Sequence, residues 1–230
     1  MKRWTPRVTM ALAVATGVVG IVPLATSQPA TAVTSVAASA PARTAAVRTA
    51  PVRTEPAAPS SYKLVIEKQY QETTYYCLPA SASMSLSTFG IKAGQDTLAR
   101  KMRTDGSGTS GDNALPVLRS YVRSRGYDYR AVADVAGRPK VLMKRVAHDV
   151  GVLHRAPSLA VWMERLPWNR GQVQGSRIGH IMVVYGYDQT KSTITVFDPW
   201  KPTGGTHTLS AKALAGTLQT AGGMQYISKL

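Results

Sequence analysis

One cysteine stands out among the residues that could do chemistry. Cys77 is the only thiol in 230 residues and lies in the stretch QETTYYCLPAS, residues 71–81. It directly precedes Leu78 and Pro79, and because proline is favoured in the first turn of a helix, we predict a helix over residues 78–89. The free amides and partial positive charge at a helix N-terminus stabilise a thiolate and lower its pKa. The position therefore indicates a nucleophile; an inert buried thiol, the usual state of a free cysteine, is the alternative.

A glutamine precedes this cysteine by six residues. The side-chain amide of Gln71 could donate a hydrogen bond to the oxyanion that forms when a thiolate attacks a carbonyl, beside the backbone N–H of Cys77. The polar Thr73 and Thr74 between them suit a surface loop that leads into a helix. Spacing alone leaves the role of Gln71 open.

His180 has the most informative surroundings of the four histidines. The runs GHIMVVYGYD and TITVFDP are separated by turn residues, a pattern typical of a β-hairpin. Cross-strand partners in a hairpin sum to a constant, so we predict that His180 lies opposite Asp198, within one residue. A carboxylate there would fix the imidazole tautomer and leave the other ring nitrogen for a nucleophile; an incidental surface pair is the alternative. His148, His154 and His207 are interpreted as surface or helix-end residues.

Other kinds of active site have little support in the sequence. One cysteine and dispersed histidines give no metal-ligand spacing, so we expect neither a metal nor any other cofactor. The acidic residues are few and scattered, unlike the carboxylate pair of a glycosidase. The glycine-rich residues 106–111 lack the Lys-Ser/Thr of a phosphate-binding loop and do not follow a strand, so we predict a flexible loop there.

The elements that must position these residues follow from hydrophobic periodicity and from turn residues. Helices come first and strands later, which predicts the α+β class with an antiparallel sheet. We predict helices over 78–89, 96–102, 112–125 (capped by Asp112 or Asn113), 139–150 and 210–219, and strands over 62–67, 127–132, 158–163, 180–188, 193–199 and 224–228.

The N-terminal residues resemble an export signal followed by a linker. Lys2, Arg3 and Arg7 precede an apolar stretch, and the small residues 30–32 offer a cleavage site, so residues 1–32 are predicted to be a signal peptide of the ordinary secretory route. A membrane anchor is the alternative, but polar residues and glycines dilute the stretch, and we expect no stable membrane insertion after its removal.

The rest of the chain divides into a linker and one domain. Residues 33–60 are rich in Ala, Thr, Pro and Arg and cannot bury enough apolar surface to offset the ordering of their backbone, so they are predicted to be a disordered linker. Residues 61–230 have a normal length for one domain and need no disulfides. A secreted, extracellular protein, possibly bound to the cell wall, is the expected localisation.

The chain is strongly basic, with a formal net charge of +16. This charge favours electrostatic association with anionic partners, of which cell-wall polymers are the candidates for an exported protein. Solubility and nonspecific adhesion are the simpler interpretation. The basic residues are scattered, with no stacking aromatics in a nucleic-acid-binding pattern, so we expect no specific nucleic-acid partner.

Three motifs together resemble a known family. QETTYYCLPAS, then GHIMVVYGYD about a hundred residues later, then VFDPW are similar to the papain-like cysteine peptidases, specifically the group related to bacteriocin-processing (double-glycine) peptidases. The resemblance spans roughly residues 68–228. It implies a papain-like fold, in which a nucleophile at a helix N-terminus packs against an antiparallel sheet. One departure is Leu78, where the family usually has glycine; it could narrow the cleft or weaken activity.

The resemblance also assigns roles. It implies Cys77 as nucleophile, His180 as general base, Asp198 as the residue that orients the histidine, and Gln71 in the oxyanion hole. Trp200, two residues past the carboxylate, would shield the Asp–His hydrogen bond with its indole.

The expected function is therefore a secreted cysteine peptidase that hydrolyses peptide bonds of peptide or protein substrates through a Cys-His-Asp thiolate mechanism. Two alternatives stay open. One is a cell-wall peptide amidase or a transglutaminase-like acyltransferase that uses the same residues. The other is a catalytically weakened protein that binds surfaces through its positive charge.

Overall fold

The computed structural model describes residues 55–175 and 177–230. The predicted signal peptide and most of the predicted linker lie outside these residues. The described helices are α1 (Cys77–Ser87), α2 (Gln95–Lys101), α3 (Gly111–Val122), α4 (Pro139–Val146) and α5 (Ala211–Thr217). Short single-turn helices occupy Arg123–Arg125, Met163–Arg165 and Pro167–Asn169, and a π-helical turn, Ala147–Val152, extends α4.

The strands form one sheet in which every pair is antiparallel, which confirms the α+β class. They are β1 (Ser61–Lys63), β2 (Tyr127–Val132), β3 (Ser158–Trp162), β4 (Gly179–Asp188), β5 (Thr193–Asp198), β6 (Gly205–Ser210) and β7 (Met224–Lys229). Their order is β2-β7-β3-β4-β5-β6, and β1 also pairs with β4. The long strand β4 therefore pairs with three strands. Strand β5 lies along one of its edges, and β3 followed by β1 lies along the other.

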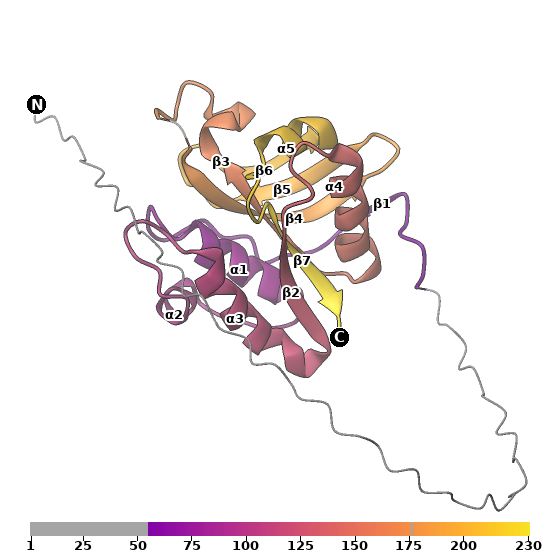
Figure 1. Cartoon of the computed structure of the whole chain (residues 1–230), viewed down its shortest axis with the longest axis horizontal. Coiled ribbons are helices and arrows are strands. Elements are labelled where there is room, and N and C mark those ends of the chain that lie inside the picture. Colours follow the sequence, from indigo (N-terminus) through magenta and orange to yellow (C-terminus); the bar gives the residue numbers. More distant parts are fainter. Residues whose placement is uncertain (1–54, 176) are drawn as a thin grey trace, which may run out of the picture. The chain divides into compact units, whose positions relative to one another are not determined.

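Alternate residues of β4 point into different parts of the core. Met182 and Val184 belong to a cluster with residues of α4 and α5, whereas Val183 and Tyr185 pack with Met84 of α1. A third cluster joins α1, α2 and α3 to β2 and β7. Figure 1 shows α1, α2 and α3 gathered on one side of the sheet, with α4 and α5 on the other. The Ser81 hydroxyl of α1 donates to the Ile181 carbonyl of β4 at 3.1 Å, which holds the N-terminal turns of α1 against the start of β4.

The hairpin forms as predicted, but its register differs from the prediction. The pair nearest the open end is Val183 with Phe197, and continuing it by one residue puts Asp198 across from Met182 rather than His180. The strands turn between Asp188 and Thr193, which moves the pairing by three residues from the predicted one, and a bulge between Val184 and Gly186 then reduces this shift to two. Since the shift is an even number of residues, His180 and Asp198 stay on the same face of the hairpin.

Some other boundaries also differ from the predictions. Strand β6 was not predicted, because its sequence GTHTLS is polar and begins with glycine. Helix α3 is capped by Ser110, whose Oγ accepts a hydrogen bond from the Asn113 amide, so the predicted caps Asp112 and Asn113 are wrong. Ser210, predicted as the cap of the last helix, does accept a hydrogen bond from Ala213.

Candidate active site

Cys77 is the first residue of α1, and its side chain is partly exposed. No side chain caps the preceding turn, and the first N–H groups of a helix have no intrahelical acceptor, so these amides are free to stabilise negative charge. Leu78 points away from solvent: it is 2% exposed and packs in the core cluster of α1, α2 and α3 while it also lines the hollow beside Cys77.

His180 and Asp198 form a buried pair. His180 Nε2 lies 2.6 Å from Asp198 Oδ1, and the two side chains are 3% and 0% exposed. Asp198 Oδ1 also accepts a hydrogen bond from the Trp200 backbone N–H at 2.9 Å. Burial alone would raise the pKa of Asp198, but the hydrogen bond and charge of His180 and the other donors hold it below its ordinary value. The carboxylate is therefore ionised at neutral pH and holds the imidazole through its Nε2.

Cys77 and His180 are coupled. Burial opposes charge on the thiol, but its hydrogen bond to His180, the histidine's charge and the backbone amides of Ile181 and Leu78 lower the pKa of Cys77. For the same reason His180, despite its burial, has a pKa raised to about 10 by Asp198 and Cys77. Both shifts favour a thiolate–imidazolium pair at neutral pH, the form in which a cysteine is a nucleophile.

The indole beside the carboxylate belongs to a different tryptophan from the one predicted. Trp168 Nε1 donates to Asp198 Oδ2 at 2.8 Å, and its ring stacks on His207 with centroids 3.7 Å apart and planes 3° from parallel. Trp200 supplies only its backbone N–H to the carboxylate. Trp168 lies in a short 3-10 helix thirty residues before Asp198, in a segment with no periodic pattern, so the sequence carried no signal for this contact.

Trp168→Phe is expected to preserve the stack on His207 but to remove one donor from Asp198. The pKa of Asp198 then rises, so the acidic limb of the activity profile moves to higher pH, and activity at neutral pH falls by about tenfold, the usual effect of one lost hydrogen bond to a charged group. A pH–rate profile of the two proteins tests this. An unchanged acidic limb would contradict the role given to the indole.

Gln71 is buried, but the hydrogen bond that its side chain donates does not involve Cys77. Its Nε2 donates to the Thr73 carbonyl at 2.7 Å, and its Oε1 has no partner within the described residues. Its backbone N–H donates to the Pro199 carbonyl, which ties the segment before α1 to the residue after Asp198. The second amide hydrogen of Nε2 is free of this bond, and the oxyanion role of Gln71 stays a prediction.

The structure thus joins Cys77, His180 and Asp198 in one site, as the motifs predicted. A family model described as the Peptidase_C39 like family matches residues 63–223, well over half of the chain. The chain belongs to this family. Membership makes it a cysteine-type peptidase with a papain-like fold and a peptide or protein substrate, which confirms the resemblance noted in the sequence.

Solved structures of low sequence identity are also similar to this C39-like peptidase. The peptidase domain of Streptococcus ComA, a bi-functional ABC transporter involved in a quorum-sensing pathway, is 17% identical, with a TM-score of 0.49 over 74% of this chain and 99% of that one. A C39-like peptidase from Bacillus anthracis is 14% identical (TM-score 0.49; 75% and 98% covered). Xylellain, a cysteine protease from Xylella fastidiosa, is 11% identical (0.49; 76% and 87%). No curated protein matches the chain.

Residues 55–175 and 177–230 offer neither a metal site nor a membrane-spanning helix. No group of three or more His, Cys, Asp or Glu residues in these ranges is arranged to hold a metal ion. No helix in these ranges is long and apolar enough to cross a bilayer.

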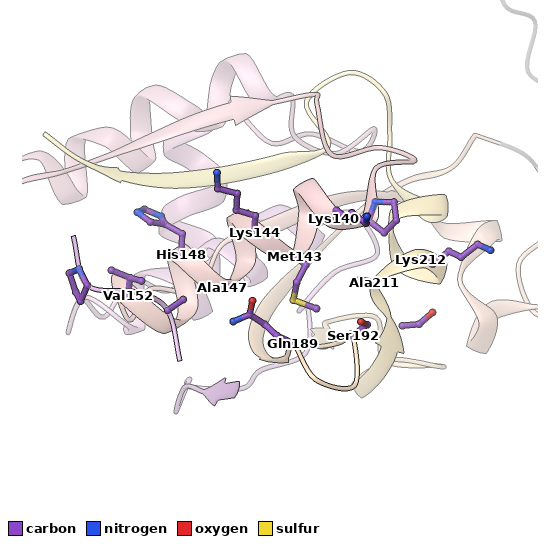
Figure 2. A pocket seen from close by; sticks show the side chains of 14 residues that line it. Lys140, Met143, Lys144, Ala147, His148, Val152, Gln189, Ser192, Ala211 and Lys212 are labelled. Atoms are coloured by element: carbon purple, nitrogen blue, oxygen red, sulfur yellow. The ribbon is translucent and has the colours of Figure 1, made fainter. Parts of the chain in front are cut away.

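A larger hollow of about 650 Å³ lies elsewhere on this peptidase, between α4, the β4–β5 turn and the start of α5. Figure 2 shows its lining: Met143, Ala147 and Ala211 are apolar, and Lys140, Lys144 and Lys212 add positive charge. None of Cys77, His180 and Asp198 lines it, so size alone does not locate the catalytic site. His148, at its edge, belongs to a second titratable cluster.

This cluster contains a fully buried carboxylate. Asp149 Oδ2 accepts a hydrogen bond from the Ile227 backbone N–H at 2.9 Å, and its Oδ1 lies 3.1 Å from His148 Nδ1. The other ring nitrogen of His148 lies 3.2 Å from Glu55, and the Tyr226 hydroxyl lies 3.0 Å from Nδ1. Burial raises the pKa of Asp149 to about 7, and the hydrogen bond that His148 donates to Asp149 raises the pKa of His148.

We expect this cluster to make stability fall as the pH rises above about 4. In the unfolded chain Asp149 ionises at an ordinary pKa near 4, whereas the folded state keeps the proton until about 7. His148 changes stability in the same direction. Its contribution to the free energy of unfolding is fully present below its pKa in the unfolded chain and is lost as the pH rises through its raised pKa in the folded state. The measurement is urea unfolding of wild type and Asp149→Asn at pH 5 and at pH 8. The free energy of unfolding of wild type, taken relative to that of the variant, should be lower at pH 8 than at pH 5 by roughly 2 kcal/mol. Parallel pH dependences would contradict it.

Proposed function

We propose that this C39-like peptidase hydrolyses peptide bonds through Cys77, His180 and Asp198. The Cys77 thiolate attacks the carbonyl carbon, and a thioester forms as the amide C–N bond breaks. The imidazolium of His180 gives its proton to the leaving amine. The neutral imidazole then takes a proton from water, which attacks the thioester and releases the acid and the thiolate, so the thiolate–imidazolium pair is restored. Asp198 keeps Nε2 protonated, so Nδ1 faces the reaction. The observation that carries the proposal is the 2.6 Å His180–Asp198 contact beside a thiol of lowered pKa.

The oxyanion that forms in this mechanism needs donors. The backbone N–H of Cys77 at the first position of α1 supplies one. The free amide hydrogen of Gln71 is the proposed second donor. Gln71→Glu would place a carboxylate there and repel the developing charge.

A peptide-library digest tests the proposed reaction. The purified protein and Cys77→Ala are incubated with a library of peptides, with and without an added amine acceptor, and the products are identified by mass. Hydrolysis products that depend on Cys77 support peptidase activity. Products carrying the added amine would instead favour the transglutaminase-like alternative, and no Cys77-dependent product would refute the proposal.

We also propose that the peptidase acts outside the cell. The basic and apolar N-terminal residues 1–32 support export. Without them the chain keeps 25 basic and 12 acidic residues, and this net charge of +13 supports retention on anionic cell-wall polymers. The intact mass of protein from the culture medium and the wall fraction tests both parts. Removal of residues 1–32 and salt-dependent release from the wall are expected; a retained N-terminus or salt-independent binding would contradict them.

A further inference from the structure

The hollow of about 650 Å³ between α4 and α5, here called the α4–α5 hollow, has an apolar floor. Met143 and Ala147 come from α4 and the turn that follows it, and Ala211 begins α5. Pro56 and Ala58, in the segment before β1, also line the hollow. Ala147 and Ala211 are buried members of the core cluster, and Met143 packs against it. An apolar group that enters the hollow therefore extends the core of the protein.

Positive charge surrounds this floor. Lys140 and Lys144 lie four residues apart on α4, so they share a face of the helix, and Lys212 follows at the start of α5. Figure 2 shows the three lysines and Met143 at the hollow. Among the lining residues that the structure describes none is Asp or Glu. None of the three ammonium groups has a carboxylate within salt-bridge distance in that part of the chain.

The carboxylates of this region are engaged by other cations. Asp134 lines an adjoining hollow together with two of these lysines, but Arg145 binds it through two hydrogen bonds of 3.0 and 2.6 Å. Glu55 lies 3.2 Å from His148 Nε2 and 3.9 Å from Lys229 Nζ. An anion that enters the α4–α5 hollow therefore gains charge pairs with the lysines without breaking any of these contacts.

The apolar floor is recessed, which does not suit a bilayer surface. The large apolar side chains that are exposed in the described part of the chain are Val65, Tyr70 and Leu230, and none of them lines the hollow. A segment that binds a bilayer inserts protruding apolar side chains below the headgroups. The α4–α5 hollow instead suits an apolar group that leaves water and enters the protein.

The polar groups of the lining also do not suit a polypeptide. Two of the three uncharged polar side chains already bond to the protein's own backbone: Gln189 Nε2 donates to the Pro59 carbonyl at 2.9 Å, and Ser210 Oγ accepts from the Ala213 amide at 3.1 Å. A peptide lying on the apolar floor would leave backbone N–H and C=O groups unpaired, at a cost in free energy. An alkyl chain carries no such groups.

We propose that the α4–α5 hollow binds a single-chain anionic amphiphile of the fatty-acid class. The alkyl chain lies on the floor formed by Met143, Ala147 and Ala211, and the carboxylate lies among the three lysines. The volume of the hollow is in the usual range for small-molecule sites. None of the catalytic residues lines it, so the inference does not depend on the proposed peptidase activity.

The test is isothermal titration calorimetry of the purified protein with sodium laurate at neutral pH, below the concentration at which laurate forms micelles. Wild type should bind laurate, and decanoate should bind roughly tenfold more weakly, because two fewer methylene groups are buried. Dodecyltrimethylammonium has the same alkyl chain with a cationic head and should not bind, since its head would lie among lysines without a carboxylate in the lining.

Two triple variants separate the hollow from the overall charge. Lys140→Gln/Lys144→Gln/Lys212→Gln should weaken laurate binding by at least about tenfold. The matched control, Lys92→Gln/Lys101→Gln/Lys201→Gln, loses the same charge at exposed lysines outside the hollow and should change binding by less than about threefold. Met143→Glu, which places a carboxylate on the floor, should abolish binding, and urea unfolding curves check that each variant is folded.

Several results would overturn the proposal. They are wild type that does not bind laurate, an equal loss of affinity in both triple variants, or equal binding of laurate and dodecyltrimethylammonium. The same titration with phosphatidylglycerol vesicles and with an acidic apolar peptide examines the other occupants. Binding of either probe that depends on the three lysines, without binding of laurate, would assign the hollow to a bilayer or to a polypeptide instead.

Discussion

Cys77→Ser is expected to lower kcat/KM for peptide hydrolysis by at least about 10⁴-fold, the largest effect of any single change in this protein. The variant keeps the size and hydrogen-bonding capacity of the side chain but loses its acidity. The lowered pKa of the thiol lets Cys77 exist as an anion beside His180, whereas a serine hydroxyl in the same place stays protonated. Serine therefore lacks the charged state on which this site depends.

The folded state provides the control for this result. Cys77 is partly exposed at the first turn of α1, and the core contacts of the helix come from residues such as Leu78 and Met84, so Cys77→Ser should unfold within about 1 kcal/mol of wild type. Urea unfolding curves of both proteins check this. A serine variant with activity within tenfold of wild type would show that the anionic sulfur does not carry the reaction.

Asp198→Ala should give the second largest effect, a loss of about 10³-fold in kcat/KM. The substitution leaves the buried His180 Nε2–H without an acceptor. It also removes the acceptor of the Trp168 indole N–H and of the Trp200 backbone N–H. The imidazole then loses its fixed orientation and the charge that raises its pKa, so the basic limb of the activity profile moves to lower pH. Steady-state kinetics between pH 5 and pH 10 measure both effects.

Asp198→Asn separates charge from hydrogen bonding. An asparagine oxygen can still accept from His180 Nε2 and from the Trp200 amide, but its NH₂ would face the indole N–H of Trp168. We expect activity between wild type and the alanine variant. Adding Trp168→Phe removes the opposing donor and should raise activity of the asparagine variant about threefold or more, although the same change lowers wild-type activity. If both changes simply add, the carboxylate–indole contact has no bearing on catalysis.

The residues that could be located from the sequence are those fixed by local rules. Cys77 followed by Leu78 and Pro79 marks a helix start, and the hairpin is marked by its turn residues, so the sequence alone indicates Cys77, His180 and Asp198 as candidate site residues. The exact pairing could not be predicted, because the strands turn between Asp188 and Thr193, later than the expected midpoint at residue 189, and because the bulge after Val184 depends on how β4 fits its neighbours. The error was harmless, since a shift by an even number of residues preserves the face.

Contacts made by irregular segments could not be predicted. Trp168 reaches Asp198 from a short 3-10 helix thirty residues away, and Gln225 lines the hollow beside Cys77 because β7 lies between β2 and β3. The return from β5 to β6 is a further case: an added Cβ at Gly204 would lie 2.1 Å from the Trp200 carbonyl, so only glycine allows this tight turn after Asp198. The sequence shows the glycine but not the chain that approaches it.

The most direct test of this account is the rate of Cys77 alkylation by iodoacetamide as a function of pH, in wild type and in His180→Gln. Wild type should react with an apparent pKa well below the ordinary thiol value of about 8.5, and His180→Gln should return it toward that value. Since Cys77 is the only cysteine, mass spectrometry of the intact protein reads this one site. A wild-type thiol that ionises near 8.5 or above, unchanged in His180→Gln, would contradict the thiolate–imidazolium pair.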